Sequence, residues 1–144
     1  RALAAIQERD ARIVRQDQAL RELSTPILEQ WDHVLTLPII GMVDSRRAAD
    51  MMEALLLRVA EMQSKYVIID VTAVEFVDTG TADHIVKMAR ALGLMGALPV
   101  ITGIRPAVAQ TLAQIGADLG GIETLGSLKA GLKWCLQGIS KVTK

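Results

Sequence analysis

The sequence predicts an α/β domain built on a mixed, mostly parallel β-sheet, with an antiparallel lead-in strand and about four covering helices. Three observations support this prediction. Short apolar runs alternate with longer amphipathic segments along most of the chain. One run, Tyr66–Val71, is almost continuously apolar, as expected for a central strand that is covered on both faces. Two strand-like runs precede the first amphipathic segment and flank a tight turn, which is typical of a hairpin.

The first segment, residues 1–23, is rich in helix formers and lacks Gly and Pro, so a helix is expected. Ile6, Ile13 and Leu20 recur every seven residues, as in a short coiled-coil seam with partly polar companion positions. A lone helix of this polarity is marginal in water. We therefore expect a linker or dimerisation helix; packing on its own domain is the alternative. Because the chain begins with Arg1 and not Met, we also expect a fragment of a longer protein.

Residues 24–144 are expected to form the domain itself. Pro26 ends the first helix, because proline removes a hydrogen-bond donor. Ile27–Trp31 and Val34–Ile40 are then predicted to be two strands around a turn. Pro38 inside the second run indicates an edge or a bulge at that point.

Helices and strands alternate through the remainder of the chain. Asp44 or Ser45 is expected to cap a helix over Arg46–Gln63, in which Met and Leu residues at helical spacing form one apolar face. The further elements expected are the strand Tyr66–Val71, the helix Thr79–Leu92 ending at Gly93, the strand Leu98–Thr102, the helix from Pro106 to about Ile115, the strand Ile122–Thr124 and the helix Leu128–Gln137 capped by Ser127. Alternation of this kind makes neighbouring parallel strands joined by helical crossovers.

The composition argues against several functional classes. With 51% hydrophobic residues, the chain has enough apolar material for a well-filled core. Because 16 basic residues balance 16 acidic ones, there is no electrostatic footprint for nucleic acid or an anionic membrane. No apolar run approaches the roughly 20 residues that span a bilayer. The single Cys135 excludes an internal disulfide and fits a reducing compartment; we expect it to be packed in the last helix.

The sequence lacks the usual motifs for catalysis. His33 and His84 are far apart and lie in no metal-binding frame. There is no GxSxG, GxxxxGK[ST] or GxGxxG motif. A Mg²⁺-dependent enzyme that uses Asp70, Glu75 and Asp78, all near the end of one strand, is the enzymatic alternative. We predict instead a domain without catalytic residues, metal or cofactor, which acts through its surface.

Two segments carry a family resemblance: VIIDVTAVEFVDTGTADHI at 67–85 and VITGIRPAVAQTLAQIGADL at 100–119. They closely resemble the STAS domain of anti-sigma factor antagonists, and in particular the RsbR-type co-antagonists of the bacterial stressosome. The resemblance covers about 20–137, and the paired DT and GIRP…AQT motifs are quite specific. It implies the STAS fold. It also implies that residues 1–23 are the end of a helix that connects to a sensor domain, which is not in this sequence.

The resemblance implies two phosphoacceptor threonines, targets of an RsbT-like serine/threonine kinase. The acceptor that follows the Asp of the first motif falls on Thr79, and the acceptor in AQT falls on Thr111. We expect the docking surface near the site to include Asp78, Gly80, Thr81 and Arg105.

The partners implied are those of an RsbR-type protein: an RsbS-like STAS protein, the RsbT-like kinase, an RsbX-like phosphatase and a second copy of the chain in a homodimer. The implied role is a cytoplasmic, non-enzymatic signalling module of the general stress (sigma factor) pathway, with no cofactor, nucleic acid or membrane partner. One alternative is a ligand-binding STAS domain for a nucleotide or lipid. Another is a simple anti-sigma factor antagonist, which lacks the second motif.

Helix electrostatics favours Thr79 over Thr111 as the site of a phosphate. At a helix start, unpaired N–H groups and the positive end of the dipole stabilise a phosphate, which favours Thr79. Phosphorylation there adds about −1.5 to −2 charges beside Asp78. The alternative role for Thr79 is a plain capping hydroxyl. Thr111 is expected in mid-helix, so its role must come from exposure; a simple solvent-facing residue is the alternative.

Overall fold

The computed structural model describes residues 26–116 and 118–142, so the predicted helix over residues 1–23 lies outside the described residues. Five strands and four helices occupy this part of the chain. Their bounds are β1 Leu28–Trp31, β2 Val34–Pro38, α2 Ser45–Met62, β3 Tyr66–Asp70, α3 Thr79–Leu94, β4 Leu98–Thr102, α4 Pro106–Gln114, β5 Glu123–Leu125 and α5 Leu128–Val142.

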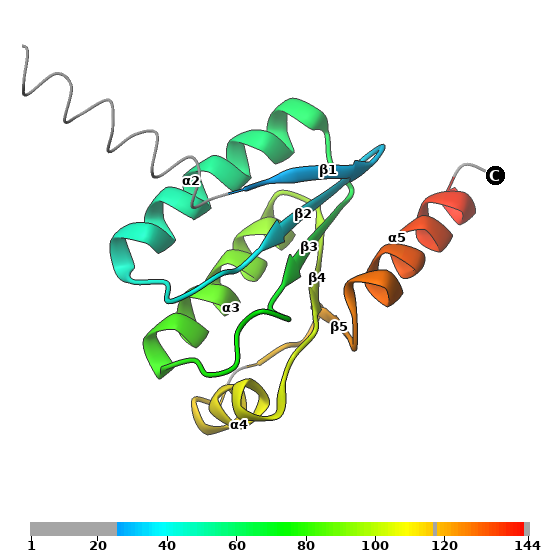
Figure 1. The fold of residues 1–144 in the computed structure, drawn as a ribbon. Helices are drawn as coiled ribbons and strands as arrows, with labels where there is room; N and C mark the ends of the chain where they lie inside the picture. The colour runs from blue at the N-terminus through cyan, green and yellow to red at the C-terminus, as the bar shows by residue number, and fades with distance from the viewer. Residues whose placement is uncertain (1–25, 117, 143–144) are drawn as a thin grey trace, which may run out of the picture.

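The strands form one sheet in the order β1-β2-β3-β4-β5. β1 pairs with β2 in antiparallel orientation, and the three other neighbouring pairs are parallel. Because each parallel strand lies next to its predecessor, the right-handed crossovers place α2, α3 and α4 on the same face. The opposite face is crossed by α5 (Figure 1). The predicted fold class, a mostly parallel sheet with an antiparallel lead-in strand and four helices, is therefore confirmed.

Each face of the sheet has its own hydrophobic layer. The larger layer lies between the sheet and α2, α3 and α4, and it includes Met51, Ile69 and Met88, all fully buried. The smaller layer, under α5, includes Ile68 and Cys135, also fully buried. Successive residues of a strand point to opposite faces, so Ile68 and Ile69 enter different layers. This explains why β3 is apolar at almost every position and confirms that Cys135 is packed.

The close approach of α5 to the sheet depends on a glycine. A Cβ added at Gly131 would lie only 2.5 Å from Cγ2 of Thr102 on β4, a separation that real Cβ atoms do not adopt. Nearby, the rings of Tyr66 and Trp134 meet edge to face with their centroids 5.6 Å apart. The first turn of α5 is capped as predicted, since Ala130 N donates to Oγ of Ser127 at 3.1 Å.

Most predicted boundaries differ from the structure by one or two residues; β2, for example, ends at Pro38 and not at Ile40. α3 does not end at Gly93 but continues to Leu94, and the left-handed turn follows at Gly96, where φ is +84°. β5 begins and ends one residue later than expected, at Glu123–Leu125. α5 continues well beyond Gln137, to Val142. Glycine within a helix weakens it without necessarily ending it, which is why Gly93 gave a misleading stop signal.

The prediction for Pro38 is also wrong. β2 is an interior strand, and the one irregularity in its pairing with β1 lies on β1, between Glu29 and Trp31. Pro38 is the last residue of β2, where it pairs with Asp70 of β3. Pairing with β1 reaches only Thr36, so the proline lies beyond the doubly paired part of the strand and disrupts no ladder.

Candidate functional site

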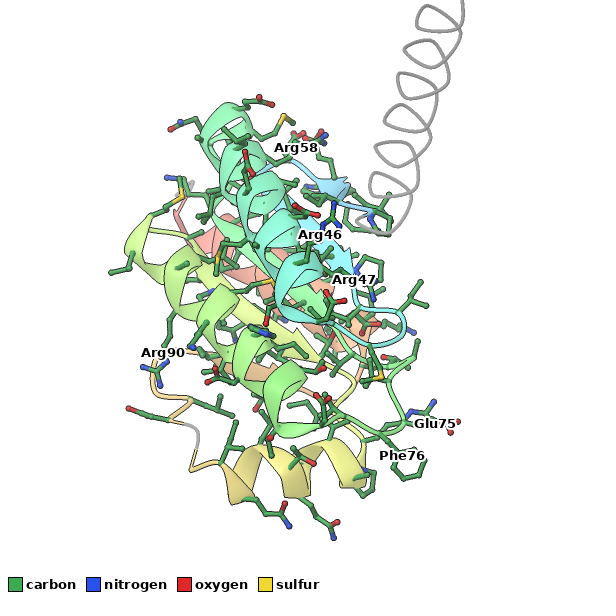
Figure 2. All side chains as sticks on the ribbon, turned by 90° about the vertical axis from the view of Figure 1, so that its left-hand side faces the viewer. Arg46, Arg47, Arg58, Glu75, Phe76 and Arg90 are labelled. Carbon is green, nitrogen blue, oxygen red and sulfur yellow. The ribbon has the colours of Figure 1, made fainter. Side chains whose placement is uncertain are left out.

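The carboxyl ends of β2, β3 and β4 meet at one edge of the sheet, and the segments that carry the predicted site leave from there. The β2–α2 loop covers residues 39–44, the β3–α3 loop covers residues 71–78, and residues 103–105 join β4 to α4. α3 and α4 both begin at this edge, below α2 in Figure 2. Residues that are well separated in the sequence are thereby brought together.

Thr79 is the first residue of α3, and it is exposed. Asp78 occupies the N-cap position, and its carboxylate accepts a hydrogen bond from the backbone N–H of Thr81 at 2.7 Å. Hydrogen bonds from Thr81 hold the pKa of the Asp78 carboxyl below its usual value. Asp78 therefore caps the helix by itself, and the Thr79 side chain lies at the surface next to a carboxylate that is charged at neutral pH.

Thr81 differs from the expectation of a docking residue. Its side chain is 3% exposed, and its hydroxyl donates to the backbone carbonyl of Val43 at 3.1 Å. A side chain that is enclosed in this way cannot form part of a docking surface. Its contact instead joins the first turn of α3 to the β2–α2 loop. Gly80, by contrast, is exposed as expected.

Thr111 lies in the middle of α4, as predicted, but it is half-buried and not solvent-facing. Its hydroxyl oxygen is 3.1 Å from the carbonyl oxygen of Ala107, one turn earlier in α4. The same hydroxyl oxygen is 3.3 Å from the carbonyl oxygen of Val77 in the β3–α3 loop. Since Val77 is two residues before Thr79, the structure places the two predicted acceptors at the same edge of the sheet.

Arg105, at the N-cap position of α4, makes a second contact to the β3–α3 loop. This residue is exposed, and its Nε donates to the carbonyl oxygen of Thr72 at 2.7 Å. Gly103 directly precedes this turn, with φ at +75° and with the side chain of Thr72 packed against it. The residue that was expected in a docking surface is thus also a tether for the loop.

Sequence reasoning missed three exposed apolar side chains at this edge. Phe76 is 80% exposed, and it projects from the β3–α3 loop away from the body of the domain (Figure 2). Met42 and Ile40, on the β2–α2 loop, are 72% and 59% exposed. We call these three residues the apolar rim. Phe76 is the one aromatic residue of the loop 71–78, but no local pattern marked it as exposed. The informative feature is that three exposed apolar side chains lie at one edge, since it is a patch and not a single apolar residue that indicates an interaction site.

Asp70 has a structural environment and not a metal-binding one. It is 9% exposed, and Oδ1 accepts hydrogen bonds from the hydroxyls of Thr72 at 2.8 Å and Thr102 at 2.6 Å. In residues 26–116 and 118–142 no three His, Cys, Asp or Glu side chains gather as they must to hold a metal ion. The arrangement gives no support to the Mg²⁺-dependent alternative. None of the helices that the structure describes has the length and hydropathy needed to cross a membrane.

The architecture defines an α/β domain whose distinctive edge consists of loops and helix starts that carry exposed hydroxyl and apolar groups. The model of the STAS domain family matches residues 25–125. The chain therefore belongs to the STAS domain family.

Among its relatives is the RsbT co-antagonist protein RsbRA of Bacillus subtilis (strain 168), which is 39% identical over 119 residues. The match covers 83% of this chain and 43% of the relative, so the chain spans less than half the length of that protein. The solved structures include an RsbS variant of Moorella thermoacetica, with 32% identity, a TM-score of 0.70 and coverage of 81% of this chain and 97% of that one.

A second solved structure comes from work on the molecular architecture of the stressosome, described as a signal integration and transduction hub. It has 31% identity and a TM-score of 0.67, and the match covers 80% of this chain and 98% of that chain. The relatives of this domain thus include an RsbT co-antagonist protein, an RsbS protein and a structure from the stressosome, in agreement with the resemblance in the two motifs.

Proposed function

We propose that this domain is a phosphorylatable signalling and scaffold module of a stressosome-type assembly in the cytoplasm, and not an enzyme. In this proposal it associates with RsbS-like STAS proteins and retains an RsbT-like serine/threonine kinase, and an RsbX-like phosphatase removes the phosphate. The observation that carries the proposal is the position of Thr79. Its side chain is exposed at the start of α3, beside the Asp78 cap and next to the loop that exposes Phe76.

The apolar rim supports a docking role for this edge of the sheet. Large apolar side chains that project from a surface contribute free energy of binding when a partner covers them. Ile40, Met42 and Phe76 come from the two loops that flank the start of α3. A kinase that docks on the rim would have the Thr79 hydroxyl within the covered area. Binding and modification would then use the same surface.

The modification itself transfers the γ-phosphoryl group of ATP to Oγ1 of Thr79. The bond between the γ-phosphorus and the bridging oxygen breaks, a P–O bond to Oγ1 forms, ADP leaves, and the hydroxyl proton passes to a base of the kinase. The product carries about −1.5 to −2 charges at neutral pH. Because the Asp78 carboxylate is already ionised at this point, the docking surface becomes strongly negative.

This added charge provides a physical route to release of the kinase. The backbone N–H of Thr81 is already occupied by the Asp78 carboxylate, so the phosphate gains less from the helix start than it would at an uncapped helix. Its charge therefore remains available to act on whatever is docked there. Placing that charge in a contact formed with apolar side chains carries a desolvation cost, which weakens retention of the kinase.

Phosphate mapping with a cognate kinase tests the proposal. The domain is incubated with the kinase and ATP, and phosphopeptides are located by mass spectrometry. We expect phosphate on Thr79 and Thr111, and its loss from the Thr79→Ala and Thr111→Ala double variant. Thr124, exposed on β5, provides the control substitution Thr124→Ala, which should leave incorporation unchanged. If the double variant takes up as much phosphate as the unchanged domain, the site assignment is wrong.

The scaffold part of the proposal needs a separate measurement. Sedimentation of the domain alone, with an RsbS-like partner and with both partner and kinase should reveal progressively larger species. A homodimer would form through residues 1–23, so deletion of this segment should reduce the mass in solution to that of one chain. If the domain remains monomeric with and without this segment, dimerisation through it is excluded.

A further inference from the structure

The β3–α3 loop is held against α4 by two hydrogen bonds that come from the second sequence motif. Near the start of the loop, Nε of Arg105 donates to the carbonyl of Thr72 at 2.7 Å. Near its end, Oγ1 of Thr111 lies 3.3 Å from the carbonyl oxygen of Val77. These contacts span 33 and 34 positions of sequence, so neither arises from local chain geometry.

The Thr111 hydrogen bond, unlike that of Arg105, can be abolished by phosphorylation of its donor. A carbonyl oxygen can only accept a hydrogen bond, so the single proton of the Thr111 hydroxyl is shared between the carbonyls of Ala107 and Val77 in a three-centre bond. Transfer of a phosphoryl group from ATP to Oγ1 replaces that same proton: the O–H bond breaks, a P–O bond forms, and ADP and the proton leave. The modified residue therefore cannot donate to Val77 through Oγ1 in any rotamer.

We propose that the Thr111 hydroxyl is a latch on the β3–α3 loop, and that phosphorylation of Thr111 opens this latch and loosens the segment that presents Thr79. The inference rests on the proposed function in one respect only, namely that Thr111 receives a phosphate. The latch itself is a property of the unmodified domain and can be tested without any kinase.

Phosphorylation of Thr111 also introduces electrostatic repulsion, in addition to removing the hydrogen bond to Val77. In the unmodified domain Oγ1 faces two carbonyl oxygens, those of Ala107 at 3.1 Å and Val77 at 3.3 Å. A phosphate of about −1.5 to −2 charges cannot remain beside two acceptors with partial negative charge. Threonine in a helix has two accessible χ1 rotamers, so the modified side chain can rotate away from the loop. Val77 then loses its partner on α4.

A change in the position of Val77 affects Thr79 through Asp78, the N-cap residue that lies between them. Asp78 follows Val77 directly, and both its carboxylate and its backbone carbonyl accept hydrogen bonds from the first turn of α3, from the N–H groups of Thr81 and Ala82. When the end of the loop moves, these capping bonds are weakened. The surface formed by the loop and the helix start becomes less preorganised, so a kinase that docks there binds less tightly.

Amide hydrogen exchange on two matched variants tests the latch. Thr111→Val keeps the shape of the side chain and removes the donor, whereas Thr111→Ser keeps the donor and removes a methyl group. We expect exchange in residues 71–82 to be about fivefold faster in the valine variant, as suits the loss of one hydrogen bond. The serine variant should exchange like the unchanged domain, and peptides from α5 should be unaffected in both.

The phosphorylated form and the kinase affinity complete the test. In the Thr79→Ala background, domain that carries phosphate on Thr111 should show the same faster exchange as Thr111→Val. With Thr79 intact, Thr111→Val should bind the kinase severalfold more weakly than Thr111→Ser. Unchanged exchange in residues 71–82, either in Thr111→Val or in the phosphorylated domain, overturns the latch. Failure of the kinase to modify Thr111 counts instead against the proposed function, because the valine and serine comparison stands without it.

Discussion

Replacing Phe76 with serine is expected to weaken kinase binding about 30-fold and to leave the stability of the domain unchanged. A phenylalanine side chain buries roughly 150–250 Å² when it is fully covered. Because Phe76 is 80% exposed, about 150 Å² of this area is available to a partner. At about 25 cal/mol per Å², complete coverage would contribute at most about 4 kcal/mol. Imperfect packing at interfaces reduces such values, so we expect a loss of about 2 kcal/mol.

The measurement is titration calorimetry of the domain with the cognate kinase, with Leu94→Ser as the matched control. Leu94 is 90% exposed, even more than Phe76, but it lies at the opposite end of α3 from Thr79. Both substitutions remove an exposed apolar side chain, so both should leave the urea unfolding midpoint unchanged. If the two variants bind the kinase with equal affinity, the edge with the apolar rim is not the docking surface.

Three further predictions concern stability and reactivity. Gly131→Ala should destabilise the domain by about 1–3 kcal/mol in urea unfolding, because the new methyl group meets β4. Gly93→Ala, with nothing within 4 Å of the new Cβ, should be neutral or stabilise by up to about 1 kcal/mol; a loss in both variants would contradict the packing argument. Asp78→Ala should lower the unfolding midpoint more at pH 7 than in strong acid. Hydrogen bonds from Thr81 depress the folded-state pKa of this carboxyl, so its contribution is fully present above the unfolded-state pKa and is lost as the pH falls through the lower folded-state pKa. Burial raises the pKa of the Cys135 thiol to about 11, so native domain at pH 8 should resist alkylation that denatured domain undergoes rapidly.

The sequence predicted a structural element correctly where the local pattern had only one interpretation. The continuous apolar run at β3 indicated a doubly covered strand, and Asp44 and Asp78 indicated the starts of α2 and α3. The end of α3 could not be predicted in this way. Gly93 and Gly96 both resemble stop signals, and only the backbone conformation, with φ at +84° for Gly96, distinguishes the real turn.

The positions of the two candidate threonines could be predicted from the sequence, but their contacts could not. The helix-start position of Thr79 and the mid-helix position of Thr111 are as predicted, whereas their role as phosphoacceptors stays a prediction. Nothing in the local sequence indicates that Thr81 turns inward to the carbonyl of Val43, which is 38 positions away. The half-burial of Thr111 was likewise hidden, because helical periodicity gives the face of a residue and not the loop that covers it.

One relation between the two motifs follows from topology once the sheet order is known. β3 and β4 are parallel neighbours, and their last residues, Asp70 and Thr102, pair with each other. The segments that leave these strands must therefore emerge side by side, whatever their sequences. The DT motif ends the first segment and the GIRP motif forms the second, so the two motifs belong to one site and not to two. Arg105 and Thr111 lie on the second segment and bond to the first, and this is why a change at either threonine is expected to affect the surface around the other.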